Sequence, residues 1–166
     1  MDEQSGSNRR RAGGMMAACI AAGNGHRVTL FEQNEKLGKK IYITGKGRCN
    51  LTNACDTEDL FAAIMKNAKF LYSAIYTFDN HALMDYFAGL GLKMKIERGN
   101  RVFPQSDHAS DVIRVLTDEL HRKKVRICLN TKVQEIVSDG TKVTGVRWDC
   151  HDTQSKNQIE AFDAVV

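Results

Sequence analysis

The chain of 166 residues is long enough for one domain with a buried core, and its 42% hydrophobic and 27% charged residues are ordinary for a globular protein. The net charge of +4, from 24 basic and 20 acidic residues, is too small to indicate a nucleic-acid-binding protein, and 7% aromatic residues offer no clear stacking platform. Five scattered cysteines without a C-x-x-C pair argue against a disulfide framework and a zinc site and favour the cytoplasm, and no apolar run approaches the roughly 20 residues of a membrane span.

Residues 1–11 predict a disordered or aberrant N-terminus, because they are polar and show no periodicity. Their three arginines, followed by small apolar residues, also fit a signal peptide, but the helical spacing that follows favours a folded segment. We therefore expect the folded part to cover residues 12–166.

The folded part begins with a helix and a strand. Ala12–Ala22 is rich in small apolar residues and predicts a helix that packs closely against a sheet. Gly23 and Gly25 end this helix, and His26–Glu32 then has the pattern of a strand. A helix, a glycine turn and a strand that ends in an acid form the second half of a βαβ unit.

The first half of that unit is not recognisable in the sequence. A dinucleotide-binding fold opens with a buried strand and the turn G-x-G-x-x-G. With Gly14 as the third glycine, the first two positions are Arg9 and Arg11, and no apolar run precedes them. An arginine at the tight turn brings a side chain to the place where the pyrophosphate should contact backbone, so the motif is broken.

The stretch Lys36–Asn53, KLGKKIYITGKGRCNLTN, is the most informative part of the chain. Glycines allow a backbone to approach a ligand closely, and free N–H groups with lysines and an arginine attract anions. The stretch is not a Walker A loop, since Lys40 and Gly47 stand where that motif requires a glycine and a serine or threonine. The alternative is a solvated surface loop.

Periodicity predicts the remaining elements. Four further helices are expected, beginning at Asp56 and over Lys69–Tyr76, Asn80–Leu90 and Asp111–Lys123. The expected strands are Leu92–Glu97, Arg101–Phe103, Val125–Leu129, Lys132–Val137, Lys142–Trp148 and Gln158–Phe162. The last three form a meander, because Asp139-Gly140 favours a hairpin, and 163–166 begins a further strand. The aromatic and methionine side chains of the central helices are expected in the core.

Four segments resemble one family in the same order. They are the stretch from Gly14 to Ala54, KFLYSAIYTFDN (69–80), ERGNRVFPQSDHASDV (97–112) and LNTKVQEI (129–136). Together they resemble the BaiN-like, aminoacetone-oxidase-like family of NAD(P)/FAD-dependent flavoproteins over residues 12–166, and TGKGRCNLTN is highly specific. The resemblance implies an α/β FAD/NAD(P)-binding Rossmann-like domain, incomplete because its first strand and C-terminal half are missing, with a three-stranded meander near the C-terminus.

The resemblance also implies cofactor-binding residues. Glu32 would hold the adenosine ribose, and its spacing of 18 residues after Gly14 supports this role. The full set is Gly14, Glu32, Lys40, Gly47, Arg48, Asn50 and Val133. The alternatives are a strand-end carboxylate for Glu32, a surface salt bridge for Arg48 and a core valine for Val133. Cys49 invites a redox role, but a structural small residue is the stronger interpretation.

The expected function is that of the N-terminal part of a cytoplasmic FAD-dependent oxidoreductase. FAD is the expected cofactor, NAD(P)H is a possible electron donor, and the full-length relative would act on a small-molecule substrate. We expect no nucleic-acid partner, no membrane partner and no metal, and we identify no catalytic residue. The alternative is a truncated non-catalytic fragment that binds nucleotide weakly or acts only by protein contacts, with self-association through open sheet edges.

Overall fold

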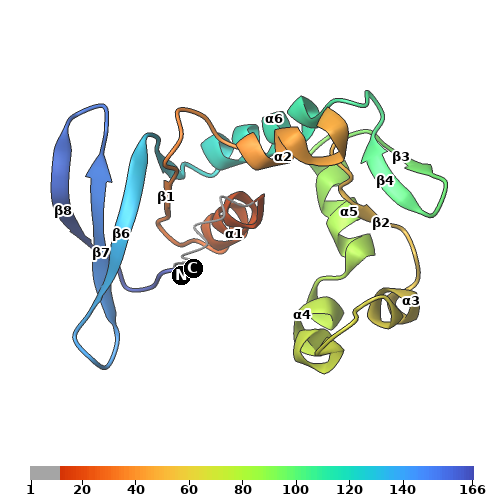
Figure 1. Ribbon diagram of the computed structural model, residues 1–166, viewed down its shortest axis with the longest axis horizontal. Coiled ribbons are helices and arrows are strands. Elements are labelled where there is room, and N and C mark those ends of the chain that lie inside the picture. Colours follow the sequence, from red (N-terminus) through yellow and green to blue (C-terminus); the bar gives the residue numbers. More distant parts are fainter. Residues whose placement is uncertain (1–11) are drawn as a thin grey trace, which may run out of the picture. The chain divides into compact units, whose positions relative to one another are not determined.

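The structure is a computed structural model that describes residues 12–166 (Figure 1), apart from the side chains of residues 44 and 45. The expected N-terminus at 1–11 lies outside the described residues. The chain divides into two compact units, one made of Met1–Lys40 and Thr117–Val166 and the other of Ile41–Leu116. Each unit is described by itself.

The first unit contains a short parallel sheet. Strand β1 (Thr29–Phe31) pairs in parallel with β5 (Arg126–Cys128), and Leu30 lies opposite Ile127. Helix α1 (Ala12–Gly23) contacts β1, as the small residues of its sequence predict. Its buried residues follow helical spacing, so they form one packed face: Met15, Ala18 and Cys19.

The predicted meander is present in the same unit. Strands β6 (Thr131–Ser138), β7 (Val143–Cys150) and β8 (Ser155–Ala161) form an antiparallel sheet in that order (Figure 1). Asp139 closes the β6–β7 turn, because its Oδ1 accepts hydrogen bonds from the backbone N–H groups of Thr141 and Lys142 at 2.9 and 3.0 Å. The strand expected at 163–166 is not formed.

Aromatic contacts join this meander to the parallel pair. The ring centroid of Phe31, the last residue of β1, lies 6.1 Å from that of Trp148 on β7 and 5.9 Å from that of Phe162. The backbone N–H of Thr131 also donates to the carbonyl of Glu32 at 3.0 Å. The carboxyl end of β1 is therefore fixed by both sheets of the first unit.

The second unit is built around a small antiparallel sheet in the order β2-β4-β3. Its strands are β2 (Thr52–Asn53), β3 (Met94–Glu97) and β4 (Arg101–Pro104). The helical segments are α2 (Lys39–Ile43), η1 (Thr44–Gly47), α3 (Thr57–Ala62), η2 (Ala68–Leu71), α4 (Tyr72–Thr77) and α5 (Asn80–Gly89). The boundary between the two units falls within α2 and within α6 (Ala109–Arg122).

The expectation of a loop over Lys36–Asn53 was wrong for its middle, which is helical from Lys39 to Gly47. The cause is packing, because the apolar side chain of Ile41 is buried and a helical turn brings it inward. The turn ends where Lys46, Gly47 and Cys49 adopt positive φ angles.

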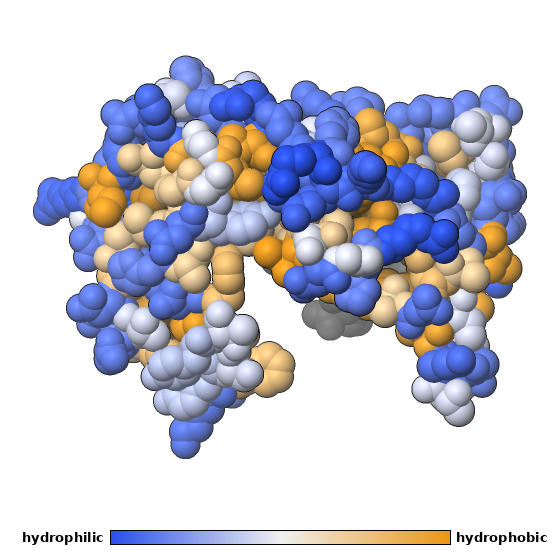
Figure 2. Space-filling view, turned by 180° about the vertical axis from the view of Figure 1, so that it is seen from behind, coloured by the Kyte–Doolittle hydropathy of each residue, from blue (hydrophilic) through white to orange (hydrophobic). Residues whose placement is uncertain are grey.

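The central helices are less buried than their sequences predict. Phe87 of α5 lies in the core, whereas the side chains of Met65 and Phe70 are 96% and 85% exposed. Tyr76 of α4 is also exposed and packs its ring 5.5 Å from that of Phe61. Figure 2 shows hydrophobic groups at the surface among the hydrophilic ones. Among residues 12–166, no helix is both long and apolar enough to cross a membrane.

Gly145 of β7 provides a test of the meander. A Cβ at this position would lie 2.3 Å from the carbonyl oxygen of Glu160 on β8. We expect Gly145→Ala to lower the free energy of unfolding by about 1–3 kcal/mol, because the β7–β8 backbone must shift. Urea unfolding followed by circular dichroism measures this change.

Gly13→Ala is the matched control in the same unit. Gly13 lies in α1, and no atom is within 4 Å of a Cβ built there. We expect this variant to be as stable as the wild type, or more stable by up to about 1 kcal/mol. Equal stability of the two alanine variants would contradict the predicted clash.

Candidate functional site

Glu32 stands at the carboxyl end of β1. Its backbone N–H donates to the carbonyl of Cys128 at 2.8 Å, which continues the parallel pairing by one residue. Its Oε1 accepts hydrogen bonds from the backbone N–H of Asn34 at 2.8 Å and from the Asn34 side chain. Its Oε2 has no hydrogen-bond partner among residues 12–166. One carboxylate oxygen therefore orders the following turn, and the other is available to accept hydrogen bonds from a ligand.

Gly14 lies in the first turn of α1, opposite β1. A Cβ built on Gly14 would be 4.0 Å from Leu30 Cδ1, which is an ordinary van der Waals contact. The position therefore matches the third glycine of a dinucleotide motif, although helix–strand packing alone would also allow alanine.

Two further predicted residues belong to the first unit. Val133 of β6 is half-buried and lies opposite Trp148 of β7, and it is not one of the fully buried residues of the core. Lys40 is exposed on α2 and forms no hydrogen bond or ion pair with the described residues.

The other three predicted residues, Gly47, Arg48 and Asn50, belong to the second unit. Gly47 has a φ of +87°, which a residue with a side chain adopts only with strain. Asn50 is exposed. Arg48 lies between two residues with positive φ, Gly47 and Cys49, and its side chain turns toward β3 and β4.

Arg48 is the centre of an ion cluster. Its Nε donates to Asp107 Oδ1 at 2.8 Å, and its Nη2 donates to the same oxygen and to Glu97 Oε1. The guanidinium carbon lies 4.2 Å from the ring centroid of Phe103, a buried residue of β4. Lys95 Nζ adds an ion pair to Asp107 Oδ2 at 2.6 Å. The salt bridge that was the alternative role for Arg48 is thus present.

The cluster alters the acidity of its members. The hydrogen bond from Arg48 lowers the pKa of Glu97 from its ordinary value of 4.5. Hydrogen bonds from Lys95 and then Arg48 lower the pKa of Asp107 from 3.8. The two carboxylates in turn raise the pKa of Arg48. The two carboxylates and the Arg48 guanidinium are therefore charged near neutral pH.

Backbone hydrogen bonds attach the same loop to β4. The N–H of Leu51 donates to the carbonyl of Val102 at 2.9 Å, and the N–H of Ala54 donates to that of Asn100 at 2.7 Å. Asn53 Nδ2 donates to the carbonyl of Gly99 at 2.8 Å. Segment 97–107, which lies within the family-like segment 97–112, therefore holds segment 48–54 in place.

Asn80 forms a long-range contact that the sequence does not predict. This buried residue begins α5, and its Nδ2 donates to the carbonyls of Asn53 and Cys55, each at 2.7 Å. A lone asparagine after a helix cap carries no signal of a contact with a loop more than twenty residues earlier. The contact fixes the end of segment 48–54 against α5.

The redox role considered for Cys49 gains no support from the structure. Cys49 is buried, as expected of a structural residue, and burial raises the pKa of Cys128. The pKa of Cys150 is lowered, first of all by a hydrogen bond with the Thr153 side chain. Within residues 12–166 the histidine, cysteine, aspartate and glutamate side chains form no group of three that could hold a metal ion.

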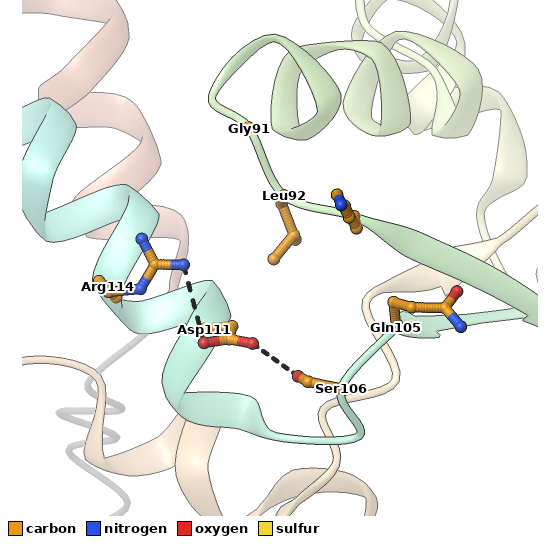
Figure 3. A pocket seen from close by; sticks show the side chains of 7 residues that line it. Gly91, Leu92, Gln105, Ser106, Asp111 and Arg114 are labelled. Atoms are coloured by element: carbon orange, nitrogen blue, oxygen red, sulfur yellow. Dashed lines mark hydrogen bonds and ion pairs between the residues drawn. The ribbon is translucent and has the colours of Figure 1, made fainter.

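The second unit also contains an open cavity of about 390 Å³ (Figure 3). Ser106 Oγ donates to Asp111 Oδ2 at 2.6 Å, and Arg114 Nη2 lies 3.7 Å from Asp111 Oδ1. Both oxygens of this carboxylate are therefore occupied, which makes it a poor general base. None of the sequence-predicted site residues lines the cavity, whose residues are Gly91, Leu92, Lys93, Gln105, Ser106, Asp111 and Arg114.

Comparison with known proteins shows a family. The sequence model of the family described as "HI0933-like protein Rossmann domain" matches residues 11–164. A similar curated protein is the 3-dehydro-bile acid delta(4,6)-reductase of Clostridium scindens, 37% identical over 75% of this chain and 30% of its own length. The ribosomal RNA dihydrouridine synthases of Escherichia coli and Haemophilus influenzae are 29% and 25% identical, over 80% and 84% of this chain and 32% and 36% of theirs. The chain thus spans about a third of the length of these curated relatives.

A solved structure supports the same fold. The crystal structure of Thermovibrio ammonificans THI4 superposes with a TM-score of 0.53 at 10% identity, over 89% of this chain and 49% of that one. The fold is therefore a partial Rossmann-like α/β domain with a three-stranded antiparallel sheet near the C-terminus, as the sequence predicted.

The ion cluster predicts a particular dependence of stability on pH. Because the pKa values of Glu97 and Asp107 are lowered by folding, their contribution to stability is present above the ordinary carboxyl values of 4.5 and 3.8 and is lost as the pH falls through the lowered ones. We expect Asp107→Asn to reduce the fall in unfolding free energy between about pH 6 and pH 3.

Urea titrations at several pH values measure this fall. Asp85→Asn is the control, because Asp85 is an exposed acid of α5 without a hydrogen bond or ion pair to the described residues. Identical pH profiles for Asp107→Asn and wild type would show that the cluster does not contribute.

Proposed function

The chain belongs to the HI0933-like protein Rossmann domain family, and from this premise we propose that it binds FAD and forms the cofactor-binding part of a flavoprotein oxidoreductase. The observation that carries the proposal is the environment of Glu32. Its carboxylate follows a parallel strand, has one oxygen without a partner among residues 12–166, and comes after a helix whose first turn contains Gly14. This arrangement is typical of the residue that binds the ribose of a dinucleotide.

The residues present fit one part of the cofactor better than another. Glu32 can accept hydrogen bonds from the ribose of the adenosine part. Val133, near the start of β6, is the proposed backbone contact for adenine. The first phosphate turn does not fit, since Arg9 and Arg11 replace two glycines whose backbone would approach the pyrophosphate. Lys40, Gly47, Arg48 and Asn50 remain proposed cofactor-binding residues, because cations and glycine backbone suit anionic groups.

A bound flavin supplies the hydride-transfer chemistry. The protein's own residues bind and orient it, and none is proposed as an acid or a base. We propose reduction of an organic ring with NAD(P)H as the electron donor, because one relative is named a reductase and two are named for making dihydrouridine.

We further propose a small-molecule substrate, no nucleic-acid or membrane partner, and the cytoplasm as the location. The relative with the highest identity of the three acts, by its name, on a bile acid derivative. The net charge of +4 supplies little attraction for RNA. Five cysteines, none of them in a disulfide, suit a reducing compartment.

A second candidate is a non-catalytic role through protein contacts. It is favoured by β1, which pairs with β5 on one side and has no strand on its other side among residues 12–166. An unpaired strand edge can accept a strand from another chain. Oligomers that grow with concentration, and that bind no flavin, would favour this role over the first.

The deciding experiment is the cofactor content of the purified 166-residue chain. Stoichiometric FAD, measured by its absorption and by release on denaturation, would support the proposal. If the chain is colourless, equilibrium titration with FAD is repeated on the variant Arg9→Gly/Arg11→Gly. Restored binding in that variant supports the proposed adenosine site, and no binding by either chain overturns the proposed function.

Glu32→Gln tests the proposed ribose contact. The amide oxygen can still accept the hydrogen bond from Asn34, so the local turn is kept while the negative charge is lost. We expect the dissociation constant for FAD to rise about tenfold to a hundredfold, as for loss of a charged hydrogen-bond acceptor.

Glu35→Gln is the control for this titration, because Glu35 is an exposed acid of the same segment that pairs with Lys39. It should bind FAD as the wild type does. An equal effect of the two substitutions would mean that overall charge, rather than the Glu32 contact, governs affinity.

A further inference from the structure

The second unit has an exposed surface of large side chains on the neighbouring helices α3 and α4 and the η2 turn between them (Figure 1). We propose that this surface, called here the aromatic face, is the interface through which two copies of the chain form a symmetric dimer. Dimerisation goes beyond the proposed function and requires no bound flavin. All residues of the aromatic face belong to the unit Ile41–Leu116.

The aromatic face is too large and too exposed to be an ordinary part of a monomer surface. Met65 is 96% exposed, Phe70 85%, Tyr76 71% and Tyr72 46%. At roughly 200 Å² for a whole aromatic side chain, the three rings alone expose about 400 Å². Exposed patches of this size mark interaction sites. The rings supply about half of the roughly 800 Å² that each partner contributes to a stable interface.

The rings of the aromatic face are ordered by one another. Phe61 of α3 packs edge-on against Tyr72, with 4.6 Å between the ring centroids, and lies 5.5 Å from the ring of Tyr76. Asn67 has a φ of +56°, and its carbonyl accepts a hydrogen bond from the N–H of Phe70 at 2.9 Å, which fixes the turn before η2. Side chains held in this way lose little entropy on association, and aromatic residues and methionine are enriched at interfaces.

Charged residues on the same segment are separated by sign. Three acids stand at the start of α3 and two lysines follow its end, namely Asp56, Glu58 and Asp59, and Lys66 and Lys69. All five are exposed, and their side chains form no hydrogen bond or ion pair with the rest of the described chain. The six residues of α3, about 9 Å in length, separate the acids from the lysines.

This separation makes the aromatic face complementary to itself. When two copies meet about a two-fold axis with their α3 helices antiparallel, the acidic end of each helix faces the lysines of the other copy. The rings then lie at the centre of the interface and the charges at its rim. A partner with charges of only one sign would be repelled at one end of the face. A second copy of the chain therefore fits it better than an acidic or a basic partner.

Sedimentation equilibrium of the purified 166-residue chain tests the dimer. We expect a reversible equilibrium between monomer and dimer without larger species, because a two-fold interface closes at two copies. Phe70→Ser should raise the dimer dissociation constant at least tenfold, because each dimer loses two central aromatic contacts. Ile159→Thr is the control, because it removes a side chain of similar exposure, 61%, from β8 in the other unit. It should leave association unchanged.

Charge reversal tests the antiparallel arrangement. Glu58→Lys/Asp59→Lys makes both ends of the face positive, and Lys66→Glu/Lys69→Glu makes both ends negative. Each double variant alone should dimerise at least tenfold more weakly than the wild type, because like charges face each other. An equimolar mixture of the two should form a heterodimer. Acids that only stabilise the first turn of α3 would give no such rescue on mixing.

Three results would overturn the dimer. The first is a wild-type chain that stays monomeric up to about 1 mM. The second is an association that Phe70→Ser leaves unchanged, which would place the contact elsewhere, for example at the open edge of β1. The third is a mixture of the charge-reversed variants that does not associate. None of these results changes the FAD content of the chain, so the proposed function stands or falls separately.

Discussion

The second unit depends on the pairing of one strand, β4, with both of its neighbours. Val102 is fully buried and lies opposite Thr52 of β2 on one side and Ile96 of β3 on the other. The same strand carries Phe103, on which Arg48 lies, and leads within three residues of Pro104 to Asp107. A change in the register of β4 would therefore separate Arg48 from its carboxylates and segment 48–54 from its support.

The first unit is organised by a different principle, the continuation of a parallel strand into Glu32, the residue proposed to bind the ribose. The pairing of β1 with β5 extends to the N–H of Glu32, and the next hydrogen bond, from Thr131, joins this point to the meander. The side chain is therefore presented from a backbone that two sheets hold. A carboxylate placed in this way loses little entropy when it binds hydroxyl groups.

Elements with local periodicity could be predicted from the sequence. The apolar spacing in their own sequences predicts α1 and α6, and the Asp139-Gly140 pair predicts its turn. The helical turn at Lys39–Gly47 could not, because a composition of glycine and lysine does not reveal that Ile41 is buried. Met65 was expected inside and is exposed, since helical spacing identifies an apolar face but not whether another element covers it.

The candidate site was predictable in part for the same reason. Glu32 follows a strand at the spacing of a known motif, so its position could be read from the chain. Arg48 could be named from its family-like segment, but its partners are 49 and 59 residues away. That contact depends on the β2–β4 register, which no local pattern encodes.

The contact between Phe31 and Trp148 has a spectroscopic consequence. Trp148 is the single tryptophan of the chain, and its indole Nε1 is buried without a hydrogen-bond partner among the described residues. Its ring lies beside the residue that precedes Glu32. An indole shielded from water emits at shorter wavelength than an exposed one, so this fluorophore is a native optical label of the first unit. The exposed Tyr72 and Tyr76 are chromophores of the second unit, and the two halves of the chain can be followed separately without any engineered dye.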